Sequence, residues 1–274
     1  MESISRRRAL AIAGGALLGA TGVAATVGEA TAATAWRRLV VVTANIGRDD
    51  LSQRETAIRD VRHAVDGADP LVGWQEIGEG DDDGREPAWI NQYFGERYRN
   101  AFEYDPAAHR VPISVPREFN IADRRVTPVH GGKEGVSPNR VITEVVLTAA
   151  DDPALSFVFA NTHYVAGAWN GQEDPYEDWR DSMWAEHFRK HRDLVIAHWR
   201  AKGYPVIWTG DCNRDPMPLL LPNHEQRAFG AGIDQIAWIP GTNGTELRLN
   251  STKVVPMHVD GHNARVAVMS VRRA

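Results

Sequence analysis

Apolar runs of strand length constrain the fold of this chain more than any other feature. They outnumber the helical patterns, and most are apolar at consecutive positions, as is typical of strands buried on both faces. The segment 150–153, Ala-Asp-Asp-Pro, predicts a hairpin turn between two of them. The runs occur at residues 37–46, 71–77, 139–149, 155–165, 205–211, 232–239 and 264–273.

Helical periodicity is found in two segments. The segment 52–70 predicts an amphipathic helix that Ser52 can cap and that ends before Gly67. Residues 175–202 form a longer helical pattern that Gly203 terminates. Its apolar positions are Trp184, Phe188, Val195 and Trp199.

These elements predict an α/β fold in which sheets pack face to face and helices cover the outside. We expect the tryptophans of the long helix to lie in the core. His187 and His191 share a helical face, but no His-Glu-x-x-His motif accompanies them, so we expect that face to be solvent-exposed rather than zinc-binding. Residues 78–135 are rich in Asp, Gly, Arg and Pro and predict short strands at best.

The N-terminal segment has the pattern of an export signal. An arginine cluster at residues 6–8 precedes a weakly apolar Ala/Gly/Leu run, and small residues follow up to Ala35. Ser5-Arg6-Arg7 is similar to the twin-arginine signal of bacteria. We expect residues 1–35 to be removed on export and residues 36–274 to form the secreted, extracellular domain. A membrane anchor is the alternative, but the run is Gly-rich and interrupted.

Charge and cysteine content limit the interactions of the exported chain. Loss of residues 1–35 removes three Arg and two Glu and changes the formal net charge from −5 to −6. The exported chain has no run of basic residues of the kind that binds nucleic acid passively. A bound cation can nevertheless supply positive charge at a phosphate. Cys212 is the single cysteine, so no intrachain disulfide can form. The sequence indicates neither a protein partner nor stable membrane insertion after cleavage of the signal.

Polar side chains recur where the predicted strands end. The best example is the stretch Tyr-Pro-Val-Ile-Trp-Thr-Gly-Asp-Cys-Asn, in which a strand delivers Asp211 and Asn213 on alternate positions. Taken alone, this is an ordinary turn, since Asp and Asn favour turns. In α/β sheets, however, ligands gather where strand ends converge, and carboxylate and carbonyl oxygens suit Mg²⁺. The other strand-end residues are Asn45, Gln75, Glu76, Asn161, Thr162, His163, Asp234, Asp260 and His262.

This ordered set of motifs resembles the endonuclease/exonuclease/phosphatase superfamily. The motifs are T-x-N, Q-E, N-T-H, G-D-x-N, I-D-x-I and a terminal Asp/His element, and they span residues 38–272. Each is weak alone, but the set is specific. The resemblance implies a four-layer α-β-β-α sandwich of two mostly antiparallel sheets, with the active site at one sheet edge.

The resemblance also assigns roles to the site residues. Glu76 is similar to the family's metal-binding Glu, with Asn45 beside the metal. The implied ion is Mg²⁺ or Mn²⁺, with Ca²⁺ also possible. The family usually ends in Ser-Asp-His, whereas this chain has Val-Asp-Gly-His. Either Gly261 replaces the aspartate, or one residue is inserted and Asp260 still reaches the metal.

The remaining assignments concern the chemistry at the phosphate. Asp211 matches the residue that orients or deprotonates the attacking water, and Asn213 its neighbour that holds the water and the phosphate. His163 matches a donor to a phosphate oxygen. His262 matches the terminal His, and Asp234 the carboxylate that favours its charged form.

Together these features predict a secreted, metal-dependent phosphoric-ester hydrolase, and we expect a nuclease that cleaves phosphodiester bonds of DNA. A sphingomyelinase-like or other phosphodiesterase or phosphatase that acts on a non-nucleic substrate is the alternative. A non-catalytic binding module is a further alternative, raised by the altered terminal motif. Loss of turnover in EDTA would distinguish an enzyme from a binder.

Overall fold

The computed structural model describes residues 34–47, 53–65, 67–78, 85–169, 177–259 and 261–274. Residues 32–274 form one compact unit. The predicted export signal lies almost wholly outside the described residues, as does Ser52, the predicted helix cap. No helix in the described part of the chain is long and apolar enough to span a membrane.

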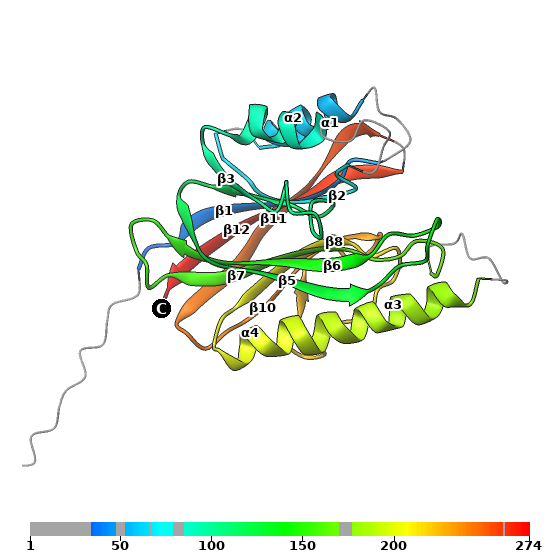
Figure 1. The fold of residues 1–274 in the computed structure, drawn as a ribbon. Helices are drawn as coiled ribbons and strands as arrows, with labels where there is room; N and C mark the ends of the chain where they lie inside the picture. The colour runs from blue at the N-terminus through cyan, green and yellow to red at the C-terminus, as the bar shows by residue number, and fades with distance from the viewer. Residues whose placement is uncertain (1–33, 48–52, 66, 79–84, 170–176, 260) are drawn as a thin grey trace, which may run out of the picture. The chain divides into compact units, whose positions relative to one another are not determined.

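The described strands form two sheets (Figure 1). The first has the strand order β11-β12-β1-β2-β4-β3, and β1 pairs in parallel with β2 and antiparallel with β12. Its strands are β1 Arg37–Asn45, β2 Leu71–Gln75, β3 Tyr98–Ala101, β4 Ile113–Pro116, β11 Thr245–Val259 and β12 His262–Arg273.

The second sheet has the order β5-β6-β7-β8-β10-β9, and its one parallel pair among the described strands is β7 with β8. The predicted hairpin turn at 150–153 joins the antiparallel strands β6 and β7. The strands are β5 Phe119–His130, β6 Arg140–Ala149, β7 Ser156–His163, β8 Val206–Asp211, β9 Gln226–Arg227 and β10 Asp234–Ile239.

Alternation along the strands builds the layers. In β8, Ile207 joins the cluster between the two sheets, whereas Val206 and Trp208 join the cluster beneath the helices of the second sheet. In β1, Val41 faces the other sheet and Val42 packs under the helices of the first sheet. Both faces are covered, which explains why these runs are apolar at consecutive positions.

Helices cover the outer face of each sheet, which completes the predicted α-β-β-α sandwich (Figure 1). α1 and α2 pack on the first sheet, and the broken long helix packs on the second. The helices are α1 Arg54–Arg62, α2 Arg85–Phe94, α3 Trp179–Lys190, the π-helix η1 His191–Ile196 and α4 Ala197–Ala201.

The prediction for residues 78–135 was right for the short strands β3 and β4 and wrong for the rest. This region also contains helix α2, and β5 runs for 12 residues. β11, 15 residues long, was also not predicted. Both β5 and β11 are sheet edges. An edge strand keeps polar and charged side chains in solvent, so neither segment has the apolar pattern of a buried strand.

The prediction for the histidines of the long helix was also wrong, whereas Trp184 and Trp199 are buried as expected. His187 and His191 are fully buried. His187 Nε2 lies 2.8 Å from the Thr162 hydroxyl oxygen, and His191 Nδ1 lies 3.0 Å from the Tyr164 hydroxyl oxygen. The histidines belong to the buried stripe because the polar atoms of the sheet beneath satisfy one nitrogen of each ring.

Candidate active site

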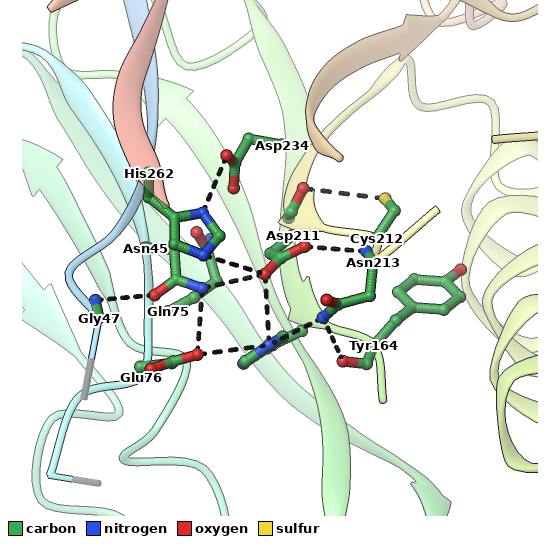
Figure 2. A network of polar contacts seen from close by, with 12 residues as sticks. Asn45, Gly47, Gln75, Glu76, Tyr164, Asp211, Cys212, Asn213, Asp234 and His262 are labelled. Atoms are coloured by element: carbon green, nitrogen blue, oxygen red, sulfur yellow. Dashed lines mark hydrogen bonds and ion pairs between the residues drawn. The ribbon is translucent and has the colours of Figure 1, made fainter. Parts of the chain in front are cut away.

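The strand directions bring the predicted residues to one edge of the sandwich. β1 and β2 run parallel, so Asn45 lies beside Gln75, and Glu76 follows. β7 and β8 run parallel, so His163 lies beside Asp211. β10 and β12 run antiparallel to their neighbours and begin at this edge, which places Asp234 and His262 there. Figure 2 shows the side chains of Asn45, Glu76, Asp211, Asp234 and His262 converging.

Asp211 lies at the centre of the cluster and is 1% exposed. Its Oδ2 accepts a hydrogen bond of 2.9 Å from Asn45 Nδ2, and Oδ1 accepts one of 2.8 Å from the Asn213 backbone N–H. His163 Nε2 lies 3.4 Å from Asp211 Oδ2, and His262 Nε2 lies 3.9 Å from it (Figure 2). A single carboxylate therefore contacts residues from both sheets.

The turn after β8 is both a local turn and part of the site. Asn213 has a φ of +46°, and its Nδ2 donates to the Tyr164 carbonyl at 3.0 Å and lies 3.2 Å from His163 Nε2. Gly210 is required because a Cβ there would lie 2.5 Å from the Thr162 carbonyl oxygen of β7. Asp211 and Asn213, which are separated by one residue, thus face one site.

Glu76 comes from the other sheet, and its backbone is strained, with a φ of +62°. Its Oε1 accepts a hydrogen bond of 3.2 Å from Asn45 Nδ2 and lies 3.8 Å from His163 Nε2. Asn45 therefore links Glu76 to Asp211. Glu76 Oε1 and Asp211 Oδ2 approach the same amide nitrogen and the same imidazole.

His262 and Asp234 form a dyad. Nδ1 of His262 lies 3.1 Å from Asp234 Oδ2. Burial alone would lower the pKa of His262, but the hydrogen bond to Asp234 and the negative charges of Asp234, Asp211 and Glu76 raise it to about 9. The imidazole is therefore protonated at neutral pH, and Nε2–H faces Asp211.

Burial and the charge of Asp234 raise the pKa of Asp211 to about 7, although the charge of His262 opposes this shift. A carboxylate with such a pKa can accept a proton near neutral pH, which is the property of a general base. Asp234 thus holds the imidazole of His262, and that imidazole faces Asp211.

The oxygen donors fit a hard divalent cation. Donor atoms of Asp211, Asp234 and His262 lie within 4.8 Å of one another, but a protonated His262 cannot be a ligand. Carboxylates remain: Glu76, whose side chain is 15% exposed, Asp211, and Asp234, whose buried Oδ1 has no hydrogen-bond partner in the described part of the chain. A divalent cation would offset the repulsion among these negative charges.

Asp260 lies outside the described residues. Its neighbours account for the altered motif, because Val259 pairs with His262 across the β11–β12 hairpin. Gly261, directly before His262, has a φ of +77°. Asp-Gly is a preferred sequence for a two-residue hairpin loop, a signal that the sequence-based predictions missed. The residue directly before His262 offers no carboxylate.

Some strand-end residues do not belong to the site. Gln75 and Asn161 are fully buried between the sheets, and Gln75 Nε2 donates to Asn161 Oδ1 at 2.6 Å. Asn161 Nδ2 in turn donates to the Trp74 carbonyl at 2.7 Å. These amides join the two sheets behind the site.

Arg54 and Glu86 are site-supporting residues that sequence reasoning missed. Arg54 Nη1 donates to the Glu76 carbonyl at 3.1 Å and to Glu86 Oε1 at 2.7 Å. Arg54 is fully buried and Glu86 is 1% exposed. Arg54 occupies a position on a helix that reads as surface, so no local pattern reveals its role.

Solved structures share this fold. An endonuclease/exonuclease/phosphatase family protein from Bacteroides thetaiotaomicron is similar with a TM-score of 0.60 and 14% identity, over 86% of this chain and 98% of that chain. The catalytic domain of human nocturnin, solved with bound sulfate, has a TM-score of 0.56 and 15% identity, over 85% of this chain and 94% of that chain. A mannosyl-6-phosphatase from the same Bacteroides species has a TM-score of 0.57 and 14% identity, over 86% of this chain and 98% of that chain.

In comparisons of sequence, neither a protein-family model nor a curated protein matches the chain. At these identities the structural likeness establishes the fold. The resemblance drawn from the ordered motifs is confirmed at that level.

Proposed function

We propose that this chain, which has the fold of the endonuclease/exonuclease/phosphatase proteins, is a metal-dependent phosphodiester hydrolase that cleaves DNA. The observation that carries the proposal is the convergence of Glu76, Asp211, Asn213, His163 and His262 on one edge, with Asp211 within hydrogen-bond distance of residues from both sheets. Glu76 and the Oδ1 of Asp234 that is unpaired within the described residues offer oxygen ligands for the metal, which leaves Asp211 free to accept a proton.

Each residue has a task that its surroundings favour. Asn213 orients the water, and Asp211 accepts its proton as the oxygen attacks phosphorus and the ester bond breaks. His262, kept protonated by Asp234, donates to a phosphate oxygen as negative charge grows there, and His163 contacts the same group. The bound metal would stabilise charge on the phosphate.

The substrate panel that tests this proposal has supercoiled plasmid, single-stranded RNA, sphingomyelin and bis(p-nitrophenyl) phosphate. Each is incubated with the purified chain in Mg²⁺, Mn²⁺ or EDTA. We expect plasmid nicking in Mg²⁺ or Mn²⁺ and none in EDTA. Turnover of sphingomyelin alone would retain the chemistry and replace the substrate. If none of the four substrates is hydrolysed in Mg²⁺ or in Mn²⁺, the hydrolase is refuted and a binding module is favoured.

Export belongs to the same proposal, because external DNA is a target that an exported enzyme can reach. The support is the arginine cluster, apolar run and small-residue stretch within residues 1–35. Fused to a reporter in a bacterium, this segment should direct the reporter out of the cytoplasm. Replacement of Arg6 and Arg7 by Lys should stop a twin-arginine export route. A reporter retained in the cytoplasm with the natural segment would contradict export.

A further inference from the structure

Arg214 directly follows Asn213, and its guanidinium lies between two indole rings. Its Cζ is 4.5 Å from the centre of Trp169 and 4.7 Å from the centre of Trp184. Trp184 is buried, and its Nε1–H donates to the Cys212 carbonyl at 2.8 Å. Trp169 and Arg214 also form an isolated parallel β-bridge. The guanidinium is therefore held in place by aromatic stacking and backbone pairing.

The stacking leaves the edge of the guanidinium without an acceptor. Within the described residues, Arg214 makes neither a hydrogen bond nor an ion pair. Arg180 provides the contrast: it also stacks on a tryptophan, Trp179, at 4.5 Å, but it donates to Glu177 and to the Ala166 carbonyl. A guanidinium has N–H donors around its whole edge, and those of Arg214 are available to solvent or to a ligand.

We propose that Arg214 forms an anion subsite for a second phosphate of the substrate, next to the phosphate that is cut. This inference rests on the proposed phosphodiesterase function and specifies its substrate as a polyanion. Asn213 contacts His163 within the site, and Arg214 is the next residue along the chain, which brings its backbone to the edge of the site. A planar guanidinium edge pairs with two phosphate oxygens at once.

The same arrangement favours nucleic acid over sphingomyelin. Trp169 is 42% exposed, so part of the indole that covers Arg214 faces solvent and can stack on a base. The sphingomyelin headgroup carries a quaternary ammonium beside its phosphate. Aromatic rings alone would attract that cation, but a guanidinium fixed between them repels it.

The test compares substrates with one phosphate and with several. Arg214→Gln should lower kcat/KM for a single-stranded DNA oligonucleotide about 10- to 100-fold, because a charge-assisted hydrogen bond is lost. It should change hydrolysis of bis(p-nitrophenyl) phosphate less than about threefold, because that substrate has no second phosphate. Arg214→Lys should be intermediate, because it keeps the charge but not the paired donors.

Arg248→Gln is the matched control. Arg248 stacks on Trp36 at 4.5 Å and has no hydrogen bond in the described part of the chain, but it is exposed. It pairs with Ser270, eight residues along β12 from His262, and thus lies far from the site. We expect it to leave both activities unchanged. Equal losses on both substrates in Arg214→Gln, or no loss on the oligonucleotide, would overturn the subsite.

A binding measurement separates this inference from the proposed function. Fluorescence anisotropy of a labelled oligonucleotide, with Asp211→Asn to prevent cleavage, should show about tenfold weaker binding when Arg214→Gln is added. If the chain hydrolyses nothing but Arg214→Gln weakens this binding, the subsite stands and the hydrolase fails. If the chain cleaves DNA and neither binding nor kcat/KM changes, the hydrolase stands and the subsite fails.

Discussion

Glu76 is held in a left-handed backbone conformation by a charged pair that has no access to water. Arg54 donates to the Glu76 carbonyl and to Glu86, and both members of the ion pair are buried. A buried ion pair is weak evidence of stability, since removal of the charges from water costs several kcal/mol. A strained residue persists only where its surroundings fix it. We infer that the pair positions Glu76 for the proposed metal.

This reasoning predicts that stability and metal affinity respond differently when the ion pair is replaced by apolar side chains. Arg54→Met alone should lower the free energy of unfolding by about 3–5 kcal/mol, because Glu86 is left buried and unpaired. Arg54→Met with Glu86→Leu should recover most of that loss. The double variant should still bind Mn²⁺ about 10- to 100-fold more weakly, measured by calorimetry. Wild-type Mn²⁺ affinity in the double variant would show that the pair does not position Glu76.

Gly210 provides a second test at the residue scale. Gly210→Ala places a Cβ 2.5 Å from the Thr162 carbonyl oxygen, so β7 and β8 must separate beside the site. We expect a loss of about 1–3 kcal/mol in urea-induced unfolding. Gly230→Ala is the control, because its Cβ meets nothing within 4 Å, and it should change stability by less than about 0.5 kcal/mol. Equal stability of the two variants would contradict this account of close packing.

The reach of sequence reasoning differs from residue to residue. The predicted site residues lie at strand ends or one to two residues beyond them, so strand polarity brings them together. They are Glu76, His163, Asp211, Asn213, Asp234 and His262. Arg54 and Arg214 act through contacts with Glu86 and two tryptophans that are distant in sequence. No local pattern encodes such contacts, so these residues could be found only after folding.

At the scale of elements, the inner face of the long helix contributes His187 and His191 to a buried histidine cluster that also includes His130 of β5. His187 stacks on Tyr164 with ring centres 3.7 Å apart, and the ring of His130 lies 6.0 Å from that of His187. Burial lowers the pKa of His191 to about 3 and of His130 to about 4, and it lowers the pKa of His187 well below its usual value. The folded protein therefore holds these imidazoles neutral.

This cluster predicts loss of stability in acid. Near pH 6.5 and below, the unfolded chain takes up protons that the folded chain excludes, so the free energy of unfolding falls as the pH drops. For His191 the loss at pH 5 should be about 2 kcal/mol. His191→Gln should reduce the slope of stability against pH between 6.5 and 4. An unchanged slope in His191→Gln would exclude this cause.

Edge and interior strands differ in how well the sequence predicts them. β1 and β8 are covered on both faces and appear as apolar runs. β5 and β11 are edges with charged residues on their solvent side, and their pattern resembles a loop. Helix η1 was not predicted either, since the apolar spacing indicated one continuous α-helix and residues 191–196 form a π-helix. A strand that is buried on both faces can therefore be predicted from the sequence.

At the scale of the whole molecule, the sandwich brings carboxylates from two sheets to one edge. Glu76 belongs to the first sheet, and Asp211 and Asp234 belong to the second. Their mutual repulsion opposes closure of the two sheets around the site. A cation that binds between them should therefore stabilise the entire fold, because the two sheets share one core.

Thermal unfolding tests this coupling. Mn²⁺ at about 100 times its dissociation constant should add about 2.7 kcal/mol, which raises Tm by about 5–10 °C relative to EDTA. Glu76→Gln should lose most of the rise. Glu134→Gln, in an exposed loop, should keep it. A Tm that is the same in Mn²⁺ and EDTA for the wild-type chain would argue against a metal at this edge.

The order of the motifs predicted the layers and the location of the site, because local sequence patterns indicate strand polarity and burial. Local patterns do not indicate the identity of the substrate, since it depends on the loops around the edge.

The most direct test of the central claim is a single-turnover measurement of DNA cleavage by Asp211→Asn in saturating Mg²⁺. If Asp211 accepts the proton of the attacking water, the rate should fall by about 10²–10⁴. Asp151→Asn, at an exposed turn, should cleave like the wild type. If Asp211→Asn cleaves at more than about a tenth of the wild-type rate, Asp211 is not the base, and the mechanism proposed for this edge is wrong.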